Sequence, residues 1–344
     1  MKDNKLSRRS FVRVSTASVA ALSMPSLVSA QPESPQQQQR PQERQPAHPV
    51  VAQPGNADAF TRYFFDSLML ESRYLDSDLP STKLELFGET FDTPIMTAAL
   101  SHLRVPNGNG LVVYAQAAKA CNAVHWFGMG EDKDLEDIIA TGARTIKVIK
   151  PHADNAEIFR RIKHAVNAGC FALGMDIDHS FDFKGNYDNV LGLPMKAKST
   201  AEIKSFVKAA GSKPFIVKGV LSVSDAKKCL QAGCAGIVIS HHGGHLKYSI
   251  PPLMVIEDIV DAVGGKMKIF VDCGITSGFD AYKCMALGAD AVSVGRHLMP
   301  LLQNGADAVA NRMKAMTSEL AGVMTATGVH NLGEFDPTVI HRVL

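Results

Sequence analysis

Short apolar runs alternate with amphipathic segments along most of this chain, and this repeat limits the possible folds more than any other feature. Eight apolar runs recur from Pro94 onward, each of a length typical of a buried strand. Their apolar residues are largely continuous, so both faces of each strand should be covered. The predicted strands are 94–100, 123–128, 145–150, 171–177, 214–220, 236–242, 268–275 and 291–298.

The segments between these runs have the pattern of helices, and several end at a glycine suited to a helix C-terminus. The predicted helices are 111–121, 134–141, 156–168, 201–210, 224–232, 253–263, 278–287 and 306–324. Eight such strand–helix units predict an α/β fold of the (β/α)8 TIM-barrel type, with an open doubly wound sheet as the alternative. Residues 56–91 form a lead-in, and residues 182–198 form a loop inserted after the fourth strand.

The first thirty residues have the order of a secretory signal. Arg8 and Arg9 are followed by a moderately apolar stretch, 14–27, and by the small residues 28–30. We interpret residues 1–30 as a twin-arginine signal peptide, with a basic tail as the alternative. This predicts the twin-arginine export machinery as a partner and a periplasmic or secreted location. Because that route carries folded proteins, it also hints at a cofactor loaded before export.

Residues 31–55 are rich in Gln and Pro and hold few large apolar side chains, so they are predicted to be a disordered linker. The globular domain is then 56–344. With 46% hydrophobic residues the chain can bury a large core, and a net charge of +2 does not suggest a nucleic-acid partner. Its six cysteines form no C-x-x-C pair and favour free, buried thiols over a disulfide.

Polar residues end several of the predicted strands. In a (β/α)8 barrel the active site lies at the carboxyl ends of the strands. Buried charges at these positions are costly without partners, so their convergence favours a functional site. The residues are Lys150, Asp176, Lys218, His242, Asp272, Gly295 and Arg296.

The last two strands end in a pattern suited to a phosphate. Gly274 and Gly278 allow a close approach of the backbone, and Arg296 offers a two-pronged donor. Barrels commonly bind phosphate at this place, with backbone amides and a helix N-terminus. The sequence therefore predicts a phosphate-bearing ligand.

Three stretches resemble the FMN-dependent α-hydroxy-acid dehydrogenase/oxidase family. They are PFIVKGVLSVSDAKKCLQAGCAGIVISHHGG, VDCGITSGFDAYKCMALGADAVSVGR and MTSELAGVMTATG. The similarity is strong over residues 214–328 and weaker over about residues 65–178. The resemblance implies FMN as cofactor, a small-molecule substrate and an electron acceptor that is oxygen, a quinone or a cytochrome. It also implies a homo-oligomer, because family members are often tetramers.

The resemblance implies a role for each matching residue. Lys218 would contact the flavin and stabilise negative charge on its reduced form, His242 would be the base, and Asp272 would pair with His242. The FMN phosphate would lie on Gly274, Gly295 and Arg296, and Ser240, in the Ser-x-His-Gly-Gly motif, is placed with the cofactor-binding residues. Converting a 2-hydroxy acid to a keto acid requires one base, an acceptor for two electrons and a group that stabilises an oxyanion.

The substrate-binding residues depart from the family pattern. His245 occupies the position of an Arg that would bind the substrate carboxylate, and Lys150 aligns near a Tyr. Lys150 and His245 are therefore the candidate substrate residues. Three readings stay open: an unusual hydroxy acid, a substrate without a carboxylate, and a flavin-binding protein without turnover. Retention of His242 and Asp272 favours an enzyme.

We do not predict a metal site. His241, His242 and His245 are close in sequence, but two glycines separate the last two of them. Four other histidines are expected on the surface or in loops: His125, His152, His164 and His179.

Overall fold

The computed structural model describes residues 55–103, 105–106, 108–182 and 184–343. The predicted signal peptide and almost all of the predicted linker lie outside these residues.

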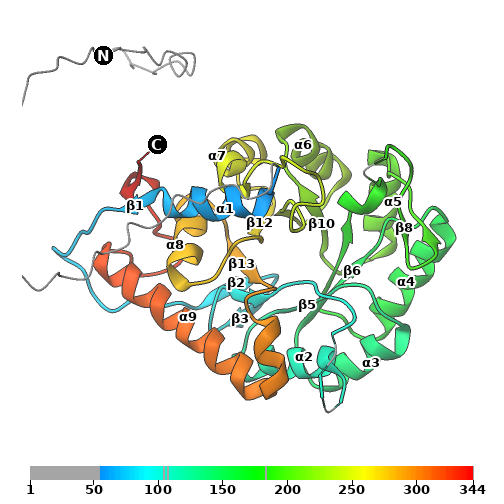
Figure 1. Cartoon of the computed structure of the whole chain (residues 1–344), viewed down its shortest axis with the longest axis horizontal. Helices are drawn as coiled ribbons and strands as arrows, with labels where there is room; N and C mark the ends of the chain where they lie inside the picture. The colour runs from blue at the N-terminus through cyan, green and yellow to red at the C-terminus, as the bar shows by residue number, and fades with distance from the viewer. Residues whose placement is uncertain (1–54, 104, 107, 183, 344) are drawn as a thin grey trace, which may run out of the picture. The chain divides into compact units, whose positions relative to one another are not determined.

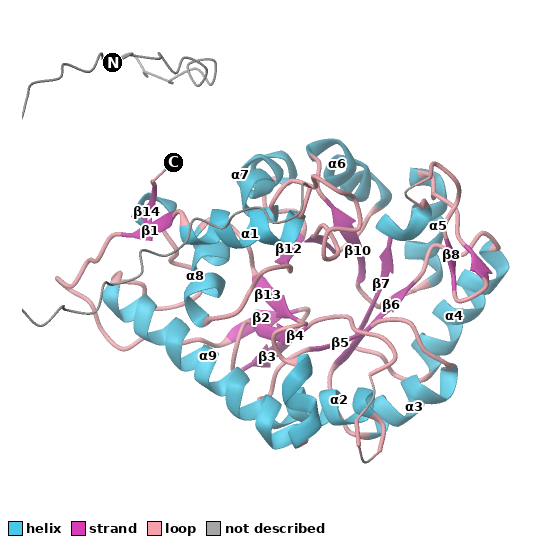
Figure 2. Ribbon diagram, in the orientation of Figure 1, coloured by secondary structure: helices cyan, strands magenta, loops and turns pink. Residues whose placement is uncertain are grey.

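Eight parallel strands form the centre of the domain (Figure 2). Along the sheet their order is β4-β13-β12-β11-β10-β7-β6-β5. The two outer strands also meet, because the amide of Gly128 donates to the carbonyl of Leu100 at 3.0 Å and Leu100 forms a parallel bridge with Phe127. The strands are β4 (Ile95–Thr97), β5 (His125–Phe127), β6 (Thr145–Ile149), β7 (Ala172–Asp176), β10 (Phe215–Val220), β11 (Gly236–Ile239), β12 (Lys268–Val271) and β13 (Ala291–Val294). The sheet is thus a nearly closed barrel, which confirms the parallel architecture and all eight predicted strands.

Helices surround this sheet, as Figure 1 shows. Serine side chains cap several of them: Ser222 accepts from the amide of Asp225, and Ser277 accepts from that of Asp280. Gly233 and Gly264 end two helices in the left-handed conformation, as predicted. The helices are α2 (Gly110–Ala120), α3 (Asp132–Ala140), α4 (Asn155–Asn167), α5 (Thr200–Ala209), α6 (Val223–Ala232), α7 (Pro252–Val263), α8 (Gly278–Ala286) and α9 (Ala306–Ala326).

Helices α8 and α9 approach each other closely at Gly278. A Cβ atom at this position would lie 2.2 Å from the carbonyl oxygen of Met316, which no side chain can tolerate. The amide of Gly278 donates to Glu319 of α9 at 2.7 Å. The glycine at the start of α8 therefore sets the distance between the two helices.

The lead-in forms two structures of different kinds. Helix α1 (Ala57–Asp66) runs into the short strand β1 (Leu68–Leu70), which pairs antiparallel with β14 (Ile340–Arg342) near the other end of the chain. The hairpin of β2 (Leu84–Leu86) and β3 (Glu89–Phe91) buries Leu84 and Phe91 in one apolar cluster with Trp126 and Phe270 of the barrel. The lead-in is thus part of the domain.

The insertion after β7 begins with the short helix η2 (Asp178–Ser180) and contains the hairpin β8 (Asn189–Val190) and β9 (Leu193–Pro194). Two further short helices, η3 (Met299–Asn304) and η4 (Pro337–Val339), follow in the C-terminal part of the chain. Among the described residues, no helix combines the length and the apolar character needed to cross a membrane.

The six cysteines form no disulfide, and five of them are buried, as predicted. The prediction for the histidines was wrong at His125, which lies in strand β5, whereas His152 lies in the loop after β6 but is buried there. His125 is 1% exposed, with Nδ1 lying 2.8 Å from the hydroxyl of Thr97, and His152 is 4% exposed. Both histidines are core residues.

Candidate active site

The carboxyl ends of the parallel strands bring the predicted site residues together. A cavity of about 440 Å³ lies there, within the range of small-molecule sites. Six residues predicted from the sequence line it: Lys218, His242, Asp272, Gly274, Gly295 and Arg296. The cavity also has small or apolar walls at Ala98, Ala99 and Leu100, beyond the end of β4.

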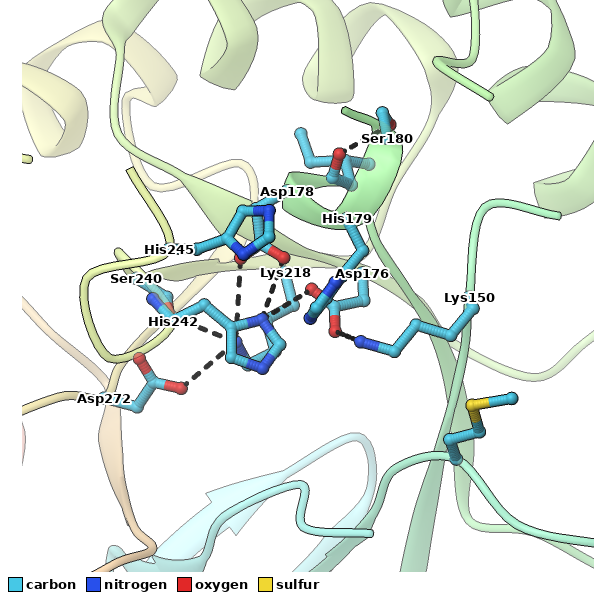
Figure 3. A network of polar contacts seen from close by, with 12 residues as sticks. Lys150, Asp176, Asp178, His179, Ser180, Lys218, Ser240, His242, His245 and Asp272 are labelled. Carbon is cyan, nitrogen blue, oxygen red and sulfur yellow. Dashed lines mark hydrogen bonds and ion pairs between the residues drawn. The ribbon is translucent and has the colours of Figure 1, made fainter. Parts of the chain in front are cut away.

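The imidazole of His242 pairs with Asp178, whereas we expected Asp272. Nδ1 of His242 lies 2.8 Å from Oδ1 of Asp178 and 3.3 Å from Oδ1 of Asp176 (Figure 3). The expected pairing is therefore wrong, because Asp272 turns to a different cation. Burial alone would lower the pKa of His242, but the two carboxylates outweigh burial and raise it to about 9.

Asp272 pairs with Lys218. The Nζ atom of Lys218 lies 3.4 Å from Oδ2 of Asp272, 4.0 Å from Oδ2 of Asp178 and 3.1 Å from the hydroxyl of Ser240. Burial would lower the pKa of this ammonium, but the surrounding carboxylates raise it above its ordinary value. Lys218 is therefore a fixed positive charge at the floor of the cavity.

Ser240 is fully buried and supports its neighbours. Besides accepting from Lys218, its hydroxyl oxygen accepts from the amide of His242 at 3.1 Å. His242 has a φ of +51°, a conformation that side chains rarely adopt, and Cys273 after the next strand has a φ of +72°. Such strained positions persist only where the surrounding structure fixes them, and they are frequent at functional sites.

Lys150 and Asp176 form a buried ion pair. The distance between Nζ of Lys150 and Oδ2 of Asp176 is 2.6 Å, and both side chains are less than a tenth exposed. Although burial opposes it, the cations of His242, Lys150 and Lys218 hold the pKa of Asp176 well below its usual value. Burial and the charge on Asp176 raise the pKa of Asp178. The predicted substrate partner Lys150 is thus already engaged by a carboxylate.

The opposite end of the cavity carries the predicted phosphate residues. Gly274 has a φ of +75°, and a Cβ atom there would lie 2.7 Å from the side chain of Thr61. Within the described residues, the backbone amides of Gly274, Gly295 and Arg296 donate no hydrogen bond. Both guanidinium NH groups of Arg296 donate to the carboxylate of Asp58 in helix α1, each at 2.6 Å.

These features fit FMN. Backbone amides that donate no hydrogen bond, together with a guanidinium, suit a phosphate at one end of the cavity. At the other end, a buried ammonium suits an electron-accepting ring that gains negative charge. Asp58 competes for Arg296, and the carboxylate of Asp272 also lines the cavity, so these two side chains do not favour an anion. Sequence reasoning did not identify Asp58 as a partner of Arg296, because Asp58 lies in a helix 238 positions earlier.

The remaining histidines of the motif differ in role. Both ring nitrogens of His241 are engaged, since Nε2 lies 2.8 Å from the hydroxyl of Thr61 and Nδ1 accepts from the amide of Gly244. His245 lies in the loop after β11, where its Nε2 is 3.2 Å from the carbonyl oxygen of Phe181. His241, His242 and His245 therefore do not converge on one point.

Fold and site together define a class: a (β/α)8-type protein with an anion cradle beside a buried cluster of Lys, His and carboxylates. The chain belongs to the FMN-dependent dehydrogenase family, whose sequence model matches residues 51–213 and 195–342. FMN is the cofactor of this family, in agreement with the expectation from the resemblance.

Individual relatives agree with this assignment. The chain is 28% identical over 312 residues to a 4-hydroxymandelate oxidase from Amycolatopsis orientalis, covering 81% of this chain and 86% of that protein. It is 26% identical over 321 residues to a 2-hydroxyacid oxidase from Dictyostelium discoideum, covering 83% and 81%. A crystal structure of mandelate oxidase superimposes with a TM-score of 0.75 at 26% identity, covering 83% of this chain and 90% of the other.

Proposed function

We propose that the protein is an FMN-dependent oxidoreductase that oxidises a 2-hydroxy acid to the 2-keto acid, with His242 as the base. The observation that carries this proposal is the position of His242 on the cavity wall, held by Asp178 and next to the buried cation Lys218. The names of the relatives, 4-hydroxymandelate oxidase and 2-hydroxyacid oxidase, support the substrate class.

His242 is oriented for proton transfer. A carboxylate only accepts hydrogen bonds, so in the neutral form of His242 Nδ1 carries the proton that faces Asp178, and Nε2 has the free lone pair. Nε2 takes the hydroxyl proton of the substrate as the carbonyl group forms. Asp176 and Asp178 then stabilise the positive imidazolium.

FMN, when bound, supplies the acceptor for the α-hydrogen and the two electrons of the substrate. Lys218 is placed to balance the negative charge that this acceptor gains, because it is an ammonium without access to bulk water. Asp272 keeps that ammonium in position through its 3.4 Å contact. Lys218 and Asp272 thus serve the electron-accepting half of the reaction, and His242 serves the proton-accepting half.

The spectrum of the purified protein tests the proposal. The protein should be yellow, and anaerobic addition of a suitable 2-hydroxy acid from a broad panel should bleach the flavin absorbance. His242→Gln should keep the flavin and bleach about 100-fold more slowly or worse. If no hydroxy acid bleaches the bound flavin, the protein is a flavin-binding protein without turnover. If His242→Gln bleaches at the normal rate, His242 is not the base.

We further propose export of the folded protein to the periplasm or beyond, with the electron acceptor met there. The paired Arg8 and Arg9 ahead of an apolar stretch support this proposal. Replacing both with Lys should retain the protein in the cytoplasm on cell fractionation, and Arg13→Lys serves as the control. Unchanged export of the double variant would refute the twin-arginine route.

A further inference from the structure

Three side chains that the proposed reaction does not use converge beside His242. They come from three segments: His179 from η2, Asp188 from the insertion ahead of β8, and His245 from the loop after β11. One ligand-type atom from each lies within 4.8 Å of the others. The rings of His179 and His245 have their centroids 4.5 Å apart, and the ring of His179 is 4.6 Å from that of His242 (Figure 3).

We propose that His179, Asp188 and His245 bind one divalent transition-metal ion of the zinc, cobalt or nickel type. Two imidazoles and one carboxylate are a common ligand set for such ions, and three protein ligands leave coordination positions open. Nδ1 of His179 lies 3.0 Å from Oδ2 of Asp188. Two ligands about 2.1 Å from a metal at the tetrahedral angle are about 3.4 Å apart, so this pair needs to open by only a few tenths of an ångström to bind one ion together.

The carboxylate of Asp188 is oriented by a hydrogen bond to the oxygen atom that does not face His179. Its second oxygen, Oδ1, accepts from the amide of Asn189 at 2.7 Å, which directs Oδ2 toward His179. Hydrogen bonds of this kind to the outer atom of a ligand are typical of metal sites.

The surroundings independently favour a cation. Asp178 Oδ2 and Asp176 Oδ1 are buried and, within the described chain, accept no hydrogen bond. Four carboxylates gather here (Asp176, Asp178, Asp188 and Asp272), against Lys150, Lys218 and His242. These carboxylates outnumber the two lysines, and a further cation among them would lower the cost of burying the excess negative charge.

If the proposed function holds, the metal site explains why the motif has His245 at the position where an Arg is expected. The resemblance led us to expect a carboxylate-binding Arg where His245 stands, and a histidine alone cannot provide that fixed charge. A metal ion on His245 would restore a permanent positive charge next to the base. Its open positions would accept the carboxylate of the hydroxy acid, which is the role we assign to this ion.

Equilibrium dialysis of the flavin-loaded protein against zinc chloride, followed by elemental analysis, tests the site. The protein should carry no histidine tag. We expect one zinc per chain at micromolar concentration, and at least tenfold weaker binding in Asp188→Asn, His179→Ala and His245→Ala. His330→Ala is the matched control, because His330 also pairs with a carboxylate, that of Glu334, but lies on the surface.

The result that would overturn the site is zinc binding that is absent, or that is equally strong in all three variants. Asp188→Asn preserves the size of the side chain, so this variant is expected to fold normally. The flavin spectrum and the melting temperature verify its folding.

The substrate role has a separate readout. Adding zinc to protein stripped with a chelator should lower KM for the hydroxy acid at least tenfold, and this effect should vanish in His245→Ala. If zinc binds and KM does not change, the substrate role is wrong and the site stands. If zinc binds but no hydroxy acid bleaches the flavin, the proposed function fails and the site stands.

Discussion

Nδ1 of His242 lies 2.8 Å from Oδ1 of Asp178, although the two residues are 64 positions apart and strand β10 separates the strands they follow. The contact crosses one strand of the barrel. It joins the proposed base to a carboxylate whose other oxygen lies 4.0 Å from Lys218. Base and buried cation are thus held by the same side chain.

This contact predicts an alkaline pH dependence. His242 must be neutral to accept a proton, and the carboxylates raise its pKa to about 9, so kcat/KM of the metal-free enzyme should rise with pH up to about 9. Asp178→Asn removes one of those charges. It should shift the rising limb to lower pH and reduce the maximal rate about 10-fold to 100-fold.

The measurement is the pH profile of kcat/KM, taken in the presence of a chelator so that no metal ion lies beside the ring. Other groups also face the ring: the charged side chains of Asp176 and Lys218, and the imidazole of His179, whose pKa burial lowers to about 4. Asp182→Asn, in the exposed insertion, is the control. A profile of Asp178→Asn that coincides with the unmodified enzyme would show that Asp178 does not set the pKa of His242.

Removing the buried ammonium should cost both stability and flavin. Lys218→Met leaves Asp272 and Asp178 as buried carboxylates with one cation fewer, at a cost of about 3–5 kcal/mol. Chemical denaturation and the flavin content per chain measure the two effects. Lys228→Met, at an exposed ion pair with Asp225, should change stability by less than about 1 kcal/mol. Equal effects of the two substitutions would contradict the role of Lys218.

Asp58 should compete with the FMN phosphate for Arg296. Arg296→Met should weaken FMN binding tenfold or more, because a two-pronged donor is lost. Asp58→Asn should tighten it a few-fold, because the guanidinium is released. Fluorescence titration of the flavin-free protein measures both affinities. Weaker binding in Asp58→Asn would mean that Asp58 orders Arg296 for the ligand instead of competing with it.

Two glycines near α9 should respond in opposite ways to alanine. Gly278→Ala places a methyl group 2.2 Å from a backbone oxygen and should destabilise the protein by about 3 kcal/mol or more. Gly322, within α9, has open space around it, and Gly322→Ala should stabilise by about 0.5–1 kcal/mol through helix propensity. Thermal denaturation of the two variants compares them directly. Similar melting temperatures would refute the close approach of α8 and α9.

Lys147 should make stability depend on pH. Burial lowers its pKa to about 7, whereas the unfolded chain keeps an ordinary value near 10.5. Between these pH values the unfolded state binds more protons, so Lys147 makes stability increase as pH rises. Lys147→Met should therefore stabilise the protein by about 1–3 kcal/mol at neutral pH, and the gain should shrink toward pH 10. Denaturation at several pH values tests this, and a gain that grows with pH would contradict it.

The sequence predicted the barrel well because continuous apolar runs and helix-ending glycines are local signals. It also predicted six of the residues that line the cavity, because the carboxyl ends of parallel strands converge. The other predicted site residues, Lys150, Ser240 and His245, are not among the lining residues. It did not predict which side chains of the site would pair with one another. Asp176 and Asp178 lie two positions apart near one strand end, and only the local path of η2 turns Asp178 toward His242.

Contacts made by distant segments were also missed. Asp188 lies in an insertion that has no repeat pattern, so its approach to His179 has no sequence signal. His125 is buried where its ring meets the hydroxyl of Thr97 on another strand. His152 is buried where it forms a bridge with Met195 of the insertion. Such contacts depend on how segments meet in space, which residue spacing does not record.

The antiparallel pairing of β1 with β14 has a consequence for the timing of assembly. Met69 pairs with His341, so β1, which directly follows α1, is held by a segment that lies 272 positions later in the chain. Helix α1 carries Asp58 and Arg62 to the cavity wall. A ribosome must therefore synthesise the chain as far as β14 before β1 can pair and the part of the cavity wall that α1 provides can be held in place.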